Sequence, residues 1–194
     1  SNTITIHTDD KKLVKSLFEK ISSSSSEVSG AIYMPEEPKD ESYDQNKEMV
    51  FKFNDLKYKG SFLALRIEGD KISIDEKLKA LTIELELSKL NTTVLDVHQS
   101  TPFWKKINNL EIFKITKNNL LRVVVPPSKG PKLMQFLGNK YKYYIDWCGS
   151  LYWIEVQSKK NSKVSDIKKL TKELGGYLTI IKTSHEYDYE ETIF

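Results

Sequence analysis

Two parts of this chain repeat one order of predicted strands and helices. In the second part, runs of β-branched and aromatic residues predict strands, and apolar residues three or four positions apart predict helices. These elements follow one another as strand, helix, strand, strand, helix and strand, at residues 119–125, 128–137, 143–147, 151–156, 167–174 and 177–181. This is the order of a ferredoxin-like βαββαβ unit.

The ends of these elements carry their own signals. Pro126 and Pro127 cannot donate to a strand ladder, so they end the first strand of the unit. Ser128 is placed to cap the helix that follows, and Gly175 is placed to end the last helix in a left-handed conformation. The apolar face predicted for the helix after Ser128 consists of Leu133, Met134, Phe136 and Leu137.

The first part of the chain predicts the same order less regularly. Strands are expected at residues 3–7, 28–33, 49–53, 62–67 and 92–97. We expect the third and fourth of these strands to form a hairpin or an interrupted ladder around residues 55–57.

Helices and loops of the first part are placed by caps and composition. One helix is expected from a cap at Asp9 or Asp10 to Ile21, and another from a capping box formed by Ser73 and Glu76. Residues 22–26, all serine, and residues 36–46, which hold many acids, are expected to be loops. A short helix carrying Trp104 is expected at 102–107, between the two parts.

Two successive units of one order predict a duplicated ferredoxin-like fold of the α+β class. Such a chain most simply forms one mostly antiparallel sheet of about seven to nine strands with helices on one face. We therefore expect residues 1–194 to form a single domain, with repeats at about 3–97 and 118–182. This architecture hosts many functions, so the function must come from particular residues.

Composition and charge narrow the classes of partner. The net charge is only +3 and lysines alternate with acids, so nucleic acid is not an expected partner. No apolar run approaches the roughly 20 residues of a membrane span, so direct membrane insertion is not expected. A single cysteine excludes an intrachain disulfide and suits the cytoplasm.

The use of arginine is unusual. Of 30 Lys plus Arg residues, only Arg66 and Arg122 are arginine, and both fall in predicted strands. Where almost every basic residue is lysine, arginine is expected at positions that require a planar guanidinium with several N–H donors. Both are therefore candidates for binding a carboxylate, and the alternative for each is an ordinary ion pair.

Other residue types indicate less chemistry. No glycine-rich phosphate loop is present, and His7, His98 and His185 lack the spacing of a metal site. Cys148 falls at a predicted hairpin turn and is interpreted as a small buried residue rather than a nucleophile. The three tryptophans, at 104, 147 and 153, can equally be core residues.

Three ordered motifs carry a family resemblance. Arg122-Val-Val-Val-Pro-Pro, Asp146-Trp-Cys-Gly-Ser-Leu-Tyr-Trp153 and Leu174-Gly-Gly-Tyr-Leu-Thr179 resemble the C-terminal half of the E subunit of bacterial glycolate oxidase. That subunit belongs to the FAD-linked oxidases of the vanillyl-alcohol-oxidase-like class. The resemblance continues upstream in order, at residues 29–31, 65–69 and 103–107, so it spans most of the chain. Cys148 and Ser150 stand where the family has glycine or another small residue.

This resemblance implies a substrate-side C-terminal domain of a flavoenzyme. The intact enzyme class oxidises a 2-hydroxy acid such as glycolate or D-lactate to the 2-oxo acid. FAD is bound mainly by an N-terminal domain expected to precede residue 1, so the chain alone should neither bind FAD tightly nor turn over. Further partners would be flavin and iron–sulfur subunits, and only these would bring the protein to the inner face of the membrane.

The resemblance marks recurring positions without settling which of them touch substrate, so the carboxylate candidates come from the chemistry of a hydroxy acid. Arg122 is the first candidate for the substrate carboxylate and Arg66 the second, whereas no general base can be named. The positions that match the family's recurring, cofactor-facing residues are Trp104, Trp147, Gly149, Trp153, Gly175 and Gly176.

Two functions of other classes remain open. The domain can be a non-catalytic assembly surface of a multi-subunit oxidase, with the loop at 36–46 and the hairpin aromatics as its contact. It can also be a stand-alone ferredoxin-like binding module, for example for RNA. The chain lacks the Lys/Arg-Gly-aromatic motif that an RNA-binding sheet of this kind uses, which disfavours that function.

Overall fold

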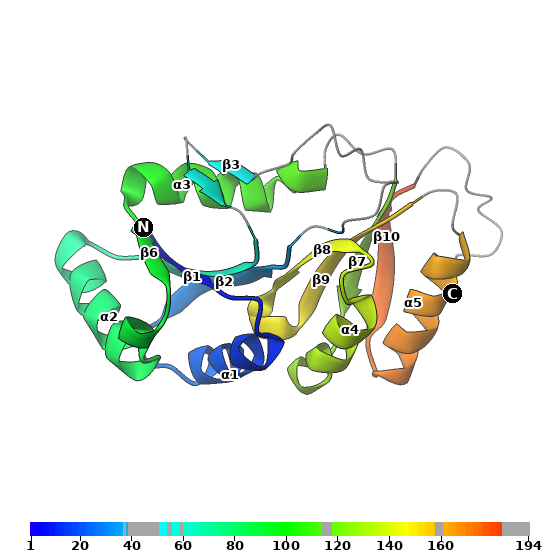
Figure 1. Cartoon of the computed structure of the whole chain (residues 1–194), viewed down its shortest axis with the longest axis horizontal. Coiled ribbons are helices and arrows are strands. Elements are labelled where there is room, and N and C mark those ends of the chain that lie inside the picture. The colour runs from blue at the N-terminus through cyan, green and yellow to red at the C-terminus, as the bar shows by residue number, and fades with distance from the viewer. Residues whose placement is uncertain are drawn as a thin grey trace.

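A computed structural model describes residues 1–36, 38, 51–53, 56–58, 60–113, 118–157 and 161–183. Its main feature is an eight-stranded sheet in which every neighbouring pair of strands is antiparallel (Figure 1). The order across this sheet is β10-β7-β9-β8-β2-β5-β1-β6. The strands are β1 (Asn2–His7), β2 (Val28–Met34), β5 (Phe62–Ile67), β6 (Thr92–Leu95), β7 (Asn119–Val124), β8 (Lys142–Asp146), β9 (Leu151–Val156) and β10 (Tyr177–Lys182).

The strand order divides the sheet into two equivalent halves. Within β6-β1-β5-β2 and within β10-β7-β9-β8, the strands of each half lie in the order fourth, first, third, second. The halves join where β2 pairs with β8, and in this pairing Tyr33 lies opposite Ile145. The predicted duplicated ferredoxin-like α+β fold with one antiparallel sheet is therefore confirmed.

Four of the described α-helices lie on one face of the sheet, as predicted, whereas α3 departs from the prediction and lies on the other face (Figure 1). The four are α1 (Lys11–Ser22), α2 (Lys71–Glu84), α4 (Gly130–Leu137) and α5 (Asn161–Glu173). Their apolar residues and the inward residues of the strands, such as Leu65 and Leu121, form the larger core. The fifth helix, α3 (Val97–Asn108), closes a smaller core that includes Phe62 and Trp104.

Several predicted boundaries need correction. Asp10 caps α1 as expected, since its carboxylate accepts from the backbone N–H of Lys12 at 2.8 Å. The predicted capping box at Ser73 is wrong, because Asp70 caps α2 by accepting from the Ser73 N–H at 2.9 Å. Ser128 does not cap α4, since it lies within the short 3-10 helix η3 (Pro127–Lys129) that precedes it.

The link between the halves is also more regular than predicted. Asp96 and Gln99 form a capping box, so β6 ends at Leu95 and α3 begins at Val97 rather than at 102. Short 3-10 helices follow α2 at η1 (Leu87–Lys89) and α3 at η2 (Glu111–Phe113).

The region between β2 and β5 contains a separate hairpin. The strands β3 (Phe51–Phe53) and β4 (Leu56–Tyr58) pair only with each other, so the predicted pairing of 49–53 with 62–67 is wrong. Instead, β5 pairs with β1 and β2. The loop predicted at 36–46 lies outside the described residues except at 36 and 38.

Candidate functional site

The sheet face opposite α4 and α5 carries the first candidate, Arg122. In β7 this residue lies directly opposite Trp153 of β9 and Thr179 of β10, so the three side chains share that face. Val124 and Tyr177 form the next pair on the same face, and Tyr177 is 62% exposed. Among the described helices, α3 and η2 pack on this side. They cover the first half of the sheet and reach Tyr144 of β8 in the second half. We call the part that carries Arg122, Trp153, Thr179 and Tyr177, over which no described α-helix packs, the open face.

Arg122 lies over an aromatic ring and has no acidic partner among the residues that the structure describes. Its guanidinium carbon is 5.4 Å from the centroid of the Trp147 ring, which places it within range of a cation–π interaction. Trp147 comes from η4 (Trp147–Gly149), the turn between β8 and β9, and is 57% exposed. Within the described part of the chain, Arg122 forms no ion pair with a carboxylate.

Arg66, the second candidate, is already paired. Its Nη2 lies 2.7 Å from Oε1 of Glu68, and its guanidinium carbon is 5.9 Å from the centroid of the Trp104 ring. Three strands separate Arg66 on β5 from Arg122 on β7. At about 4.8 Å per strand step, their Cα atoms are about 19 Å apart across the sheet. The structure therefore does not bring the two arginines together.

Trp104 is a core residue. It is only 5% exposed, and its Nε1 donates to Oγ1 of Thr3 at 2.8 Å. A Cβ atom at Gly30 would lie 3.0 Å from the Trp104 ring, so the glycine lets the ring approach the sheet. The structure thus gives Trp104 a packing role under α3, apart from the open face.

Trp153 lies at the boundary between the smaller core and the open face. It is partly buried, and its ring stacks on Tyr144 with 6.5 Å between ring centroids. Phe113 stacks on the same tyrosine at 5.9 Å. The open face therefore has an aromatic floor that begins beside Arg122 and continues into the core.

The three glycines among the site predictions have backbone roles at one end of β7. Gly175 has a φ of 75° and ends α5, as predicted. Gly176 lies so close to β7 that a Cβ atom there would be 2.2 Å from the Val124 carbonyl oxygen. Gly149 has a φ of 94° and forms the last residue of η4. A direct contact of these glycines with a cofactor stays a prediction.

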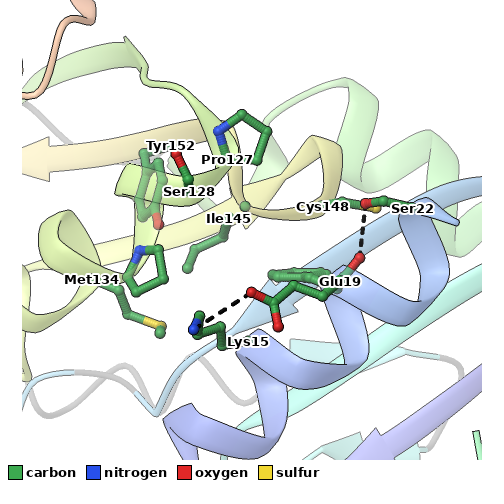
Figure 2. Close-up of a pocket in the computed structure, with 12 residues that line it drawn as sticks. Lys15, Glu19, Ser22, Pro127, Ser128, Met134, Ile145, Cys148 and Tyr152 are labelled. Carbon is green, nitrogen blue, oxygen red and sulfur yellow. Dashed lines mark hydrogen bonds and ion pairs between the residues drawn. The ribbon is translucent and has the colours of Figure 1, made fainter.

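Trp147 and Cys148 are consecutive residues of one turn, but Trp147 lies on the open face and Cys148 lies on the opposite face of the sheet. Cys148 is half-buried and lines a cleft of about 320 Å³ between α1 and α4. Figure 2 shows Cys148 beside Ser22 of α1 and the Lys15–Glu19 ion pair at the cleft. Burial raises the pKa of the Cys148 thiol, and a hydrogen bond with Ser22 opposes that shift.

Sequence reasoning missed this cleft because its walls come from distant segments. The other lining residues are Phe18, Pro127, Ser128, Pro131, Met134, Ile145, Gly149 and Tyr152. The glycine expected at position 150 is not required in this hairpin, since Ser150 has a φ of −93°. Phe136, predicted to join the apolar face of α4, is 38% exposed.

The histidines and the acidic residues form no ligand cluster in the described segments. His98 is exposed in the first turn of α3, His7 lies 6.5 Å from the Phe62 ring, and His185 is outside the described residues. No group of three His, Cys, Asp or Glu side chains in that part of the protein could hold a metal ion. The described helices include none with the length and apolar character needed to cross a membrane.

Comparison with known proteins assigns no family to this chain. No protein-family model matches the chain, and none of the curated proteins matches it.

Proposed function

We propose that this chain is the substrate-side domain of an FAD-linked oxidoreductase that oxidises a 2-hydroxy acid to a 2-oxo acid. One observation carries the proposal: Arg122 lies on an open sheet face between Trp147 and Trp153 without a described acidic partner. The other arginine is neutralised by Glu68 and lies beside a buried tryptophan. Arg122 is thus the guanidinium free to bind an external carboxylate.

The chemistry of such a substrate suits this residue. A guanidinium can donate two parallel N–H bonds to a carboxylate, which fixes the position and the orientation of a small acid. An ammonium group at the same position would supply the charge without the fork. Arg122 would therefore hold the acid group and orient the adjacent hydroxyl-bearing carbon toward a flavin covering the sheet.

The open face fits the ring of a flavin better than its phosphates. It offers flat aromatic side chains at Trp147 and Trp153 and the hydroxyl groups of the exposed Thr179 and Tyr177, which suit a planar ring system. It offers no glycine-rich loop for a pyrophosphate, so the phosphates would be held by another domain. When bound, FAD would supply the hydride acceptor, and this chain's residues would bind and orient the acid.

The first test is a flavin spectrum of the full-length gene product, co-expressed with its genomic neighbours. We expect bound flavin that bleaches when glycolate or D-lactate is added under anaerobic conditions. A well-folded full-length protein without flavin would rule out the oxidase proposal.

A pair of conservative variants then separates the two arginines. Arg122→Lys in the active enzyme should raise KM for the hydroxy acid about 10- to 100-fold, because one charge-assisted hydrogen bond is lost. Arg66→Lys should raise it far less, because Arg66 is held by Glu68. An unchanged KM in Arg122→Lys would remove Arg122 from carboxylate binding.

A second candidate is a non-catalytic assembly domain. It is favoured by apolar side chains exposed on α2 and at the start of α3, among them Ile72 at 78%, Ile83 at 79% and Val97 at 47%. Partner subunits would then bind the isolated chain, and Ile72→Asp together with Ile83→Asp would abolish that binding. Retention of the flavin signal without partner binding would favour the oxidase domain instead.

A further inference from the structure

Arg122 lies over the Trp147 ring and no described carboxylate occupies its N–H donors. A cation–π contact through the flat face of a guanidinium does not consume its five N–H donors, which point outward in its own plane. At Arg122 the guanidinium carbon lies 5.4 Å from the ring centroid. An anion can therefore accept from the N–H donors of Arg122 while the Trp147 ring contacts the guanidinium.

Arg66 offers an internal comparison. It also lies over a tryptophan, at 5.9 Å, but its Nη2 is 2.7 Å from Glu68. That tryptophan, Trp104, is 5% exposed, whereas Trp147 is 57% exposed. The same pairing of residue types thus gives a closed arrangement at Arg66 and an accessible one at Arg122.

The Trp147 ring is held by an unusual turn. Trp147, Cys148 and Gly149 have φ values of 50°, 49° and 94°, three consecutive residues in the left-handed region. This conformation costs about 1–2 kcal/mol for each residue that carries a Cβ atom. The Asp146 carboxylate accepts from the Trp147 N–H at 2.7 Å, and the Ser150 N–H donates to the Trp147 carbonyl at 3.2 Å.

Neighbouring elements clamp this turn in place. The first residue of α4, Gly130, packs on the Gly149 carbonyl so closely that a Cβ atom would lie 2.3 Å from that oxygen. Tyr152 donates its hydroxyl to the Gly130 carbonyl at 2.7 Å, and the Val125 N–H donates to the Ser150 carbonyl at 2.9 Å. Strain that persists because its surroundings enforce it is a feature of sites with a positional task.

From this geometry we propose that Trp147 is the positioning residue for Arg122. Its ring acts as a platform that holds the guanidinium fork toward the open face, where it binds the carboxylate of a small 2-hydroxy or 2-oxo acid. The inference rests on the proposed function, since it assigns the carboxylate of that substrate to this arginine. It adds a role for the turn: the left-handed backbone at 147–149 sets the position of the platform.

The composition of the chain allows a direct test by NMR on the 194-residue protein. Two arginines and three tryptophans give only two side-chain Nε signals and three indole signals, and each can be assigned by one substitution. On addition of D-lactate we expect the Arg122 Nε and Trp147 indole signals to shift together, while the Arg66 and Trp104 signals stay in place. Those two unmoved signals also report that each variant remains folded.

Variants then separate positioning from binding. Trp147→Leu should weaken D-lactate binding at Arg122 about 2- to 5-fold, the range expected for a lost cation–π contact at an exposed site, and Trp147→Phe should recover part of it. Phe136→Leu, an exposed aromatic change on α4, should leave binding unchanged.

The outcomes distinguish the inference from the function on which it rests. Equal D-lactate binding in Trp147→Leu and in the unmodified chain would overturn the positioning role while leaving Arg122 as the carboxylate ligand. No shift of Arg122 in the unmodified chain would overturn both the platform and the carboxylate role. Absence of flavin from the full-length protein would rule out the oxidase function. A measured dependence of D-lactate binding on Trp147 would still support the positioning role.

Discussion

Tyr143 and Tyr152 stack on each other in the core with 6.4 Å between their ring centroids, but only one of the two hydroxyl groups has a hydrogen-bond partner among the described residues. Tyr152 donates its hydroxyl to the Gly130 carbonyl at 2.7 Å. The Tyr143 hydroxyl is buried without a hydrogen-bond partner in the part of the chain that the structure describes, and burial raises the pKa of both phenols. Two residues of one type, equally buried, therefore contribute differently to stability.

Replacing each tyrosine by phenylalanine should separate these contributions. Tyr143→Phe removes an unsatisfied buried polar group, so the free energy of unfolding should stay constant or rise by up to about 1 kcal/mol. Tyr152→Phe removes a hydrogen bond that links β9 to α4, so the free energy of unfolding should fall by about 0.5–1.5 kcal/mol. Urea unfolding of both variants measures the difference, and a larger loss in Tyr143→Phe would mean that its hydroxyl has a partner in solution.

Gly130→Ala should destabilise the protein although the residue lies in a helix. Alanine normally stabilises a helix relative to glycine by about 0.5–1 kcal/mol. Here the added Cβ atom would lie 2.3 Å from the Gly149 carbonyl oxygen, so either the turn or α4 must move. We expect a loss of about 1–3 kcal/mol in the free energy of unfolding.

A matched control exists on α5. Ser165→Ala changes an exposed helical residue and should alter the free energy of unfolding by no more than about 0.5 kcal/mol. If Gly130→Ala were as stable as this control, the close contact between α4 and the turn would not exist in solution.

Asp146→Asn should change how stability depends on pH. Burial raises the pKa of the Asp146 carboxyl above 3.8, and the hydrogen bond from the Trp147 N–H opposes the shift. The folded protein therefore holds this proton more tightly than the unfolded chain, so its contribution to stability is lost as pH rises through the folded pKa. Asparagine keeps an oxygen that accepts from Trp147 and carries no charge.

The free energy of unfolding of Asp146→Asn should consequently rise relative to that of the unmodified chain as pH rises from about 3.5 to about 7.5. Chemical unfolding of both proteins at several pH values measures this difference, in which the carboxylates shared by the two proteins cancel. A constant difference across this range would show that Asp146 has the same pKa in the folded and the unfolded states.

Hydrophobic patterning and turn residues were sufficient to predict most of the fold. The period of the apolar residues, Pro126-Pro127 after β7 and Gly175 after α5 identify the order βαββαβ, because these signals depend on the local backbone. Prediction failed where two local signals competed. Asp70 and Ser73 can each cap α2, and only the packed helix shows that the earlier residue does so. The pairing of β3 with β4 likewise depends on a choice between available strand partners.

The candidate site divides in the same way between the sequence and the tertiary structure. Composition and local pattern were enough to identify Arg66 and Arg122 as the two arginines and to place both in strands, since both are properties of the chain. The packed structure adds that Arg66 pairs with Glu68 and that Trp147 supports Arg122. Arg66 and Glu68 are two positions apart, so strand alternation already places them on one side. The contact between Arg122 and Trp147 depends instead on a left-handed turn that packing against α4 maintains, which local periodicity does not encode.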